Sequence, residues 1–187
     1  MTPRHVFVCG DPALDFAATL RARRSSEMEV LTTPDHLESW YLESGLVDSV
    51  TPCARTDLVQ ALAVREAVYR LVTDLRHGRP YDAPSLAVVN DAARRPAAQP
   101  QLVPPGRLTT ATPQEALSTV ARRAVELLGG TESRLLKECD NPECTRVYVD
   151  RSRGARRQWC GMESCGNRFK AAAYRSRKRK TPALAAR

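Results

Sequence analysis

The chain has 187 residues and carries 29 Lys and Arg against 21 Asp and Glu, a net charge of +8. Residues 146–187 hold 13 bases and two acids, whereas residues 1–145 hold 16 bases and 19 acids. Such one-sided positive charge indicates a polyanionic partner. The sequence has no run of about 18 apolar residues and no apolar signal-peptide core, which excludes a membrane span and predicts a cytoplasmic protein with reduced thiols.

The N-terminal half reads as mainly helical. Residues 6–8 are β-prone, and the charged stretch 21–29 predicts a surface loop or a frayed helix end. Thr33 is suited to cap a helix, and Pro34 is suited to its first position. A helix is therefore predicted to begin there and to end before Gly45.

Further helices follow along the chain. Apolar residues recur at the helical period over residues 55–77, and a shorter helix is predicted over residues 85–94. Residues 96–107 are rich in Pro, Gln and Gly, which indicates a loop or an irregular hairpin. A capping box that opens at Thr112 begins the last of these helices, and Gly129 with Gly130 ends it.

Four cysteines cluster in the C-terminal part. Cys139 and Cys144 are separated by four residues, Cys160 and Cys165 by four more, and fifteen residues lie between the pairs. Two close pairs joined by a loop suit a tetrahedral zinc site of four thiolates; two disulfides or four unrelated thiols are the alternatives. All four positions are Cys and no His lies nearby, so the site is predicted to be structural, holding one Zn²⁺.

The segments around these cysteines predict a treble-clef-like module. Residues 147–149 are β-prone, residues 152–154 form a turn, and residues 158–159 return as the second strand of a hairpin. A helix is expected over residues 167–180, directly after the last cysteine. Zinc deaminases also use paired cysteines, but the segment before Cys144 lacks their second close Cys and their His-x-Glu motif, which excludes that class.

Basic residues crowd the same module. Arg168, Arg175 and Arg179 fall near one face of the predicted helix. Arg can bridge phosphates or read guanine in the major groove of DNA. The predicted nucleic-acid contacts are Arg151, Arg153, Arg156, Arg157, Arg168, Lys170, Arg175, Arg177 and Arg179. A solvated charged tail, or a basic surface for RNA or RNA polymerase, is the alternative, because charge alone does not choose the polyanion.

At these residues the sequence resembles a known family. The run 159–170, which contains Cys165-Gly166-Asn167-Arg168, resembles the CGNR zinc finger. Upstream, residues 14–16, 37–46, 64–67 and Asn90 are similar to the ABATE domain that usually precedes this finger. The resemblance covers nearly the whole chain and implies a bacterial stress-induced transcription regulator that binds DNA through the finger. Ala18 stands where the family usually has an Asn, next to Thr19.

Arg65 lies within the apolar stripe of the helix at residues 55–77, where an unpaired guanidinium would be costly. Asp15, flanked by Leu14 and Phe16, is its expected partner in a buried ion pair. The alternatives are an exposed Arg65, or a candidate ligand pocket in which Asp15, Thr19, Arg65 and Asn90 meet a small molecule.

These observations predict a mainly α protein with small β elements. A helical domain spans residues 1–133, a four-cysteine finger spans residues 134–181, and residues 182–187 form a disordered tail. The expected function is a DNA-binding transcription regulator whose finger docks on double-stranded DNA, with an N-terminal domain that senses a small-molecule effector or forms a homodimer. An interaction module for RNA or the transcription machinery is the alternative. No nucleophile–base pair, phosphate loop or acid dyad is visible, so an enzyme is not expected.

Overall fold

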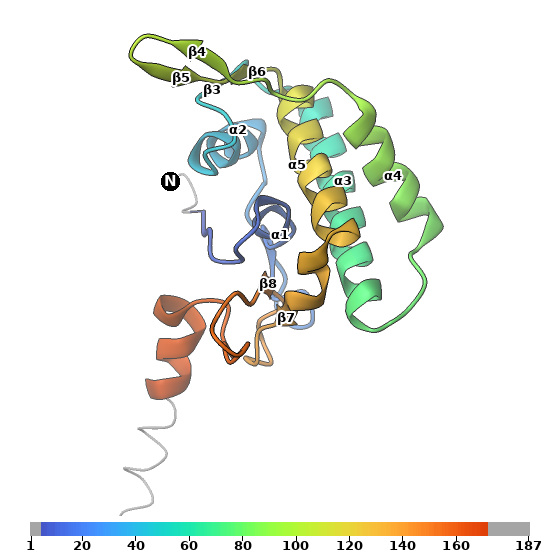
Figure 1. Ribbon diagram of the computed structural model, residues 1–187, viewed down its shortest axis with the longest axis vertical. Coiled ribbons are helices and arrows are strands. Elements are labelled where there is room, and N and C mark those ends of the chain that lie inside the picture. Colours follow the sequence, from blue (N-terminus) through green and yellow to red (C-terminus); the bar gives the residue numbers. More distant parts are fainter. Residues whose placement is uncertain (1–4, 172–187) are drawn as a thin grey trace, which may run out of the picture.

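The computed structural model describes residues 5–171, and about half of these residues are helical. Three long helices, α3, α4 and α5, lie side by side, with α1 and α2 beside them and the cysteine-rich segment at one end (Figure 1). The fold is mainly α with small β elements, as predicted. The α-helices are α1 (Pro12–Ala17), α2 (Pro34–Glu43), α3 (Arg55–Arg76), α4 (Ala83–Arg94) and α5 (Pro113–Gly129).

The strands are short and pair two by two. Strands β1–β2, β4–β5 and β7–β8 are antiparallel, and β3 pairs with β6 in parallel. The strands are β1 (Leu20–Arg21), β2 (Met28–Glu29), β3 (Ser49–Val50), β4 (Gln101–Val103), β5 (Gly106–Leu108), β6 (Thr110–Ala111), β7 (Leu136–Glu138) and β8 (Val147–Val149).

The predicted helix boundaries rest on local capping chemistry that the structure confirms. The Thr33 side chain accepts a hydrogen bond from the His36 amide at the start of α2. At α5 the cap is reciprocal, because Thr112 Oγ1 accepts from the Glu115 amide and the Glu115 carboxylate accepts from the Thr112 amide at 2.7 Å. These bonds satisfy amides that the first helical turn leaves without a partner.

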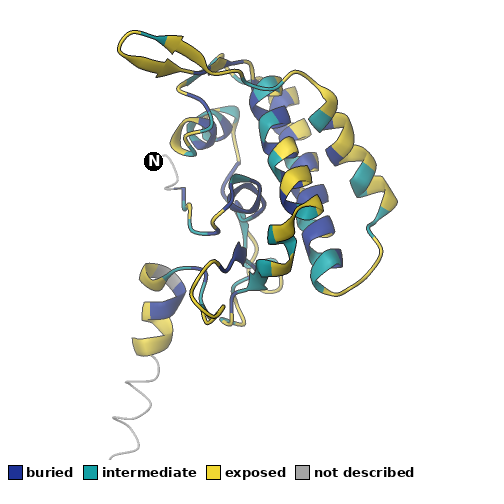
Figure 2. Ribbon diagram, in the orientation of Figure 1, coloured by how far each residue is buried: buried dark blue, intermediate teal, exposed yellow. Residues whose placement is uncertain are grey.

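The helices enclose one continuous apolar core. Helix α1 packs against α3 and α5, and its Phe16 ring lies 4.8 Å from the ring of Trp40 on α2. The inward faces of the long helices are buried while their outward faces are exposed (Figure 2). Val147, Tyr148 and Val149 of β8 are buried together with this core. No helix in the described part of the chain combines the length and apolarity that crossing a bilayer requires.

Two local expectations need adjustment. Residues 6–8, predicted to be β-prone, form no strand. The charged stretch 21–29 includes the surface loop of the β1–β2 hairpin, residues 22–27, as one of the two alternatives predicted; its ends belong to the two short strands, and no helix end forms there. Helix α1 was not predicted; Asp11 caps it, because its side chain accepts from the Ala13 amide at 2.9 Å. Residues 96–107 contain the β4–β5 hairpin, which agrees with the prediction.

The strand pairing predicted for the cysteine-rich segment is wrong. Strand β8 pairs with β7, Leu136 opposite Val149, and residues 158–159 form no strand. The buried Asp150 carboxylate explains the difference, because it accepts from the Ser152 and Arg157 amides and so closes the predicted turn into a compact loop. Gln158 then pairs through its carbonyl with the Asp140 amide at 3.0 Å. The division of the chain near residues 133 and 134 stays a prediction, and the predicted tail, residues 182–187, lies outside the described residues.

Candidate metal centre and nucleic-acid interface

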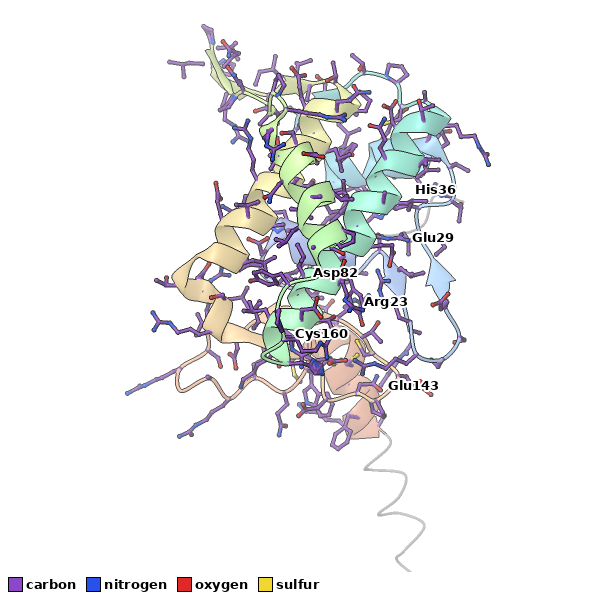
Figure 3. The ribbon with its side chains drawn as sticks, turned by 90° about the vertical axis from the view of Figure 1, so that its right-hand side faces the viewer. Arg23, Glu29, His36, Asp82, Glu143 and Cys160 are labelled. Carbon is purple, nitrogen blue, oxygen red and sulfur yellow. The ribbon has the colours of Figure 1, made fainter. Side chains whose placement is uncertain are left out.

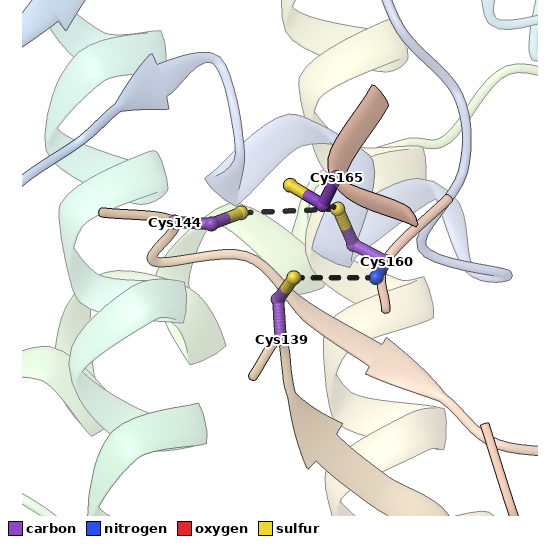
Figure 4. A group of neighbouring side chains, drawn as sticks. All are labelled: Cys139, Cys144, Cys160 and Cys165. Carbon is purple, nitrogen blue, oxygen red and sulfur yellow. Dashed lines mark hydrogen bonds between the residues drawn. The ribbon is translucent and has the colours of Figure 1, made fainter. Parts of the chain in front are cut away.

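The four predicted cysteines converge on one point (Figure 4). Their sulfur atoms all lie within 4.8 Å of one another, and none is joined in a disulfide. The Cys144 and Cys160 sulfurs are 3.8 Å apart, and those of Cys160 and Cys165 are 3.6 Å apart. Four sulfurs at ~2.3 Å from one metal stand about 3.8 Å from each other at the corners of a tetrahedron. The spacing therefore matches a tetrahedral zinc site.

Three of the four ligands are held by different local elements. Cys139 directly follows strand β7, and Cys144 lies in the turn before β8, closed by a bond from its amide to the Asn141 carbonyl at 2.8 Å. Cys165 lies in the π-helical turn Met162–Gly166, where the Gly166 amide donates to the Gly161 carbonyl at 3.0 Å. Residues 167–171 continue as a helix, in agreement with the prediction as far as the described residues reach.

N–H groups surround the sulfurs. The Cys160 amide donates to Cys139 Sγ at 3.4 Å, and the side-chain amide of Asn141 donates to Cys165 Sγ at 3.4 Å. A guanidinium nitrogen of Arg146 lies 3.8 Å from Cys160 Sγ. One Zn²⁺ leaves two negative charges on four thiolates, and these donors offset them. The donor set therefore fits zinc, and the closed ring of four cysteines makes the metal structural.

The N-terminal segment lies directly against this metal module. The Val149 amide donates to the Cys9 carbonyl at 2.8 Å, next to Gly10. Gly10 has a φ of +81°, and a side chain there would meet an Arg151 nitrogen at 3.2 Å. Glycine thus allows the backbone of residues 8–10 to approach the cysteine-rich segment closely.

Two bases predicted to contact nucleic acid are anchored within the protein. Arg157 stacks on the Tyr148 ring at 4.2 Å and donates to the Val8, Trp159 and Cys160 carbonyls. Arg151 forms a two-pronged ion pair with Glu132 and donates to the Gly10 carbonyl at 2.7 Å. Both guanidiniums therefore hold the metal module on the helical body. The sequence shows their charge but carries no signal for these carbonyl partners.

Four other predicted bases are exposed and form no ion pair with a described residue: Arg153, Arg156, Arg168 and Lys170. Arg168 and Lys170 lie on the helix that begins directly behind zinc ligand Cys165, while Arg153 and Arg156 lie in the loop after β8. Arg175, Arg177 and Arg179 lie outside the described residues.

The predicted ion pair between Arg65 and Asp15 is wrong. Arg65 is 3% exposed, and its two terminal nitrogens bind Glu29 of β2 at 2.6 and 2.7 Å. Its Nε donates to Glu66 at 2.9 Å. Figure 3 shows Glu29 and Arg23 between the β1–β2 hairpin and α3. The Asp15 carboxylate instead accepts from the amides of residues 8 and 9.

The four residues of the candidate ligand pocket do not all meet. Thr19 lies 3.4 Å from Arg65, but Asn90 is exposed on α4 and Asp15 is engaged with the N-terminal backbone. Glu29 is the residue that the sequence interpretation missed. It belongs to a two-residue strand whose pairing has no local signal, so only the three-dimensional arrangement reveals it.

A helical body that carries a structural four-cysteine zinc module and a basic helix defines a zinc-finger protein. Residues 135–178 match the CGNR zinc finger model, and residues 10–131 match the ABATE model, described as "Putative stress-induced transcription regulator". The chain therefore belongs to the ABATE family and ends in a CGNR zinc finger. No curated protein matches the chain.

Proposed function

We propose that this protein regulates transcription by binding double-stranded DNA through its zinc finger. The observation that carries the proposal is the exposure of Arg168 and Lys170 on the helix that follows zinc ligand Cys165. A helix fixed at its first turn by a metal presents its side chains in one defined geometry. Cations on such a helix can neutralise phosphates on either side of a groove.

The charge distribution favours the finger, and not the whole surface, as the part that attracts a polyanion. Residues 1–145 hold 16 bases and 19 acids, so the helical body carries no excess positive charge. The finger supplies the attraction to a polyanion. The proposed phosphate contacts are Arg153, Arg156, Arg168 and Lys170, joined by Arg175, Arg177 and Arg179 beyond the described residues. In this proposal the protein acts by binding and not by catalysis.

The test is the salt dependence of duplex binding by the zinc-loaded full chain, measured by fluorescence anisotropy. Each neutralised phosphate contributes about −0.9 to the slope of log K against log salt, so seven contacts predict a slope of about −6. The double variant Arg168→Gln/Lys170→Gln should reduce this magnitude by about 2. Arg107→Gln is the matched control, because Arg107 is exposed on β5 of the helical body.

Binding that does not weaken with salt would contradict the proposal. Tighter binding to single-stranded or duplex RNA than to duplex DNA would favour the alternative class, an RNA-contacting module. An unchanged slope in the double variant would show that the helix after Cys165 does not face the phosphates.

A further inference from the structure

Three apolar side chains form one patch on the surface of the finger: Trp159, Met162 and Phe169, called here the apolar patch. Phe169 is 56% exposed and Met162 is 50% exposed. The Trp159 and Phe169 rings lie 4.6 Å apart between centroids, at 32° to each other. Met162 and Trp159 both lie over Gly166, where a side chain would meet Met162 Sδ at 2.8 Å. The three residues are therefore contiguous.

This cluster of exposed apolar side chains differs from the isolated ones found on most protein surfaces. Single exposed apolar residues are normal and need no explanation, whereas contiguous patches mark interaction sites. Phe169 stacks on Trp159, which limits the positions its ring can take. A ring that is already ordered loses little conformational entropy when a partner covers it.

Cations flank the patch. Arg168 and Lys170 are the chain neighbours of Phe169; both are exposed and neither has an ion pair with a described residue. The nearby acids are Glu143 and Glu163, which are exposed as well. A hollow of about 400 Å³ beside Phe169 is lined by Asn141, Glu143, Cys165 and Arg168, among others. An apolar surface between cations matches a nucleic acid, whose flat apolar bases lie between anionic phosphates.

We propose that the apolar patch inserts against an opened base step of duplex DNA while Arg168 and Lys170 neutralise the flanking phosphates. This inference rests on the proposed DNA binding and adds its mode. Proteins that insert apolar side chains between base steps pay for unstacking and gain contact with the bent duplex. Stacking of a base on an aromatic ring is strong and tolerates any sequence.

The test compares a fully paired duplex with one of the same length that carries a single central mismatch. Opening costs least at a mismatch, so wild-type protein should bind the mismatched duplex several-fold more tightly. The Phe169→Ala variant should lose this preference and bind the paired duplex roughly 5- to 150-fold more weakly, with an unchanged salt slope. Phe169→Leu keeps an apolar side chain beside Trp159 but removes the aromatic face, so it should keep part of the preference and bind more weakly than wild type.

Two control variants distinguish the loss of aromatic stacking from the loss of a charge and from the loss of an exposed apolar side chain elsewhere. Arg168→Gln should weaken binding to both duplexes equally and reduce the salt slope by about 0.9. Leu102→Ala removes an exposed apolar residue, 93% exposed on β4, and should change neither affinity. Each variant must still bind one zinc per chain, which reports that the finger is folded.

Equal affinity of wild-type protein for the two duplexes would overturn this inference and leave the proposed function intact. Retention of the mismatch preference in Phe169→Ala would also overturn it and would assign the patch to another partner, such as a protein. Failure of wild-type protein to bind either duplex would overturn the proposed function itself.

Discussion

Replacing Arg157 by Ala should destabilise the whole fold rather than merely weaken binding to nucleic acid. The guanidinium stacks on Tyr148 at 4.2 Å and donates to the carbonyls of Val8, Trp159 and Cys160. It therefore ties three segments together: the N-terminal strand-like segment, strand β8 and the loop that leads to a zinc ligand.

The size of the effect follows from these contacts. A hydrogen bond to a charged group contributes about 1.5–3 kcal/mol, and a cation–π contact about 0.5–1 kcal/mol. The contacts share one side chain, so their energies do not add, and the carbonyls that lose their donor can bind water in the variant. We expect a loss of about 3 kcal/mol in the free energy of unfolding. For a chain of this length that loss lowers Tm by roughly 6–12 °C.

Thermal unfolding of the zinc-loaded protein measures this change, with Arg153→Ala as the matched control. Arg153 lies four residues away, is exposed and forms no ion pair with a described residue, so its loss should change stability by less than about 0.5 kcal/mol. Equal Tm values for the two variants, with weaker DNA binding only in Arg157→Ala, would refute the reasoning and return Arg157 to the nucleic-acid interface.

Three further predictions concern buried charge. Glu29→Gln leaves the buried Arg65 guanidinium with a weaker partner and should cost about 2 kcal/mol in urea unfolding relative to the exposed control Glu27→Gln; matching midpoints would contradict this. Hydrogen bonds from the Ser152 hydroxyl and from Lys137 hold the pKa of Asp150 well below its usual range, so its carboxylate stabilises the fold above about pH 4, and this contribution is lost as the pH falls through the folded-state pKa. The stability difference between wild type and Asp150→Asn should therefore be constant near neutral pH and shrink in acid, and a difference that grows in acid would disprove it. Arg146→Met removes a cation 3.8 Å from Cys160 Sγ and should weaken zinc binding roughly 10-fold in competition with a chelator; an unchanged affinity would show that Arg146 does not act on the thiolates.

Features with a local signal were predictable from the sequence. Thr33 with Pro34, and Thr112 with Glu115, mark helix starts because the capping partners lie within three residues of each other. The zinc ligands were also predictable, since the spacing within each cysteine pair reflects how a short turn presents two sulfurs to one ion.

Features that depend on distant partners were not predictable. Strand β7 has no strong β pattern, and only its register opposite β8 makes it a strand. Glu29 reaches Arg65 across 36 positions of the chain through a hairpin of two-residue strands. The charges of Arg151 and Arg157 suggest a phosphate partner, but the carbonyls of residues 8–10 lie against them in the fold. The sequence shows that an arginine is present, but it does not show which oxygen atom the guanidinium contacts.

Zinc bound by four cysteines holds the basic finger in the shape that we propose docks on DNA. The most direct measurement follows duplex DNA binding by fluorescence anisotropy as a chelator removes zinc from the 187-residue chain and added zinc restores it. We expect binding to fall as the metal leaves, to return with one zinc per chain, and to be absent throughout in Cys160→Ser. Binding that persists at full strength in the metal-free protein would contradict a structural role of zinc in the proposed DNA binding.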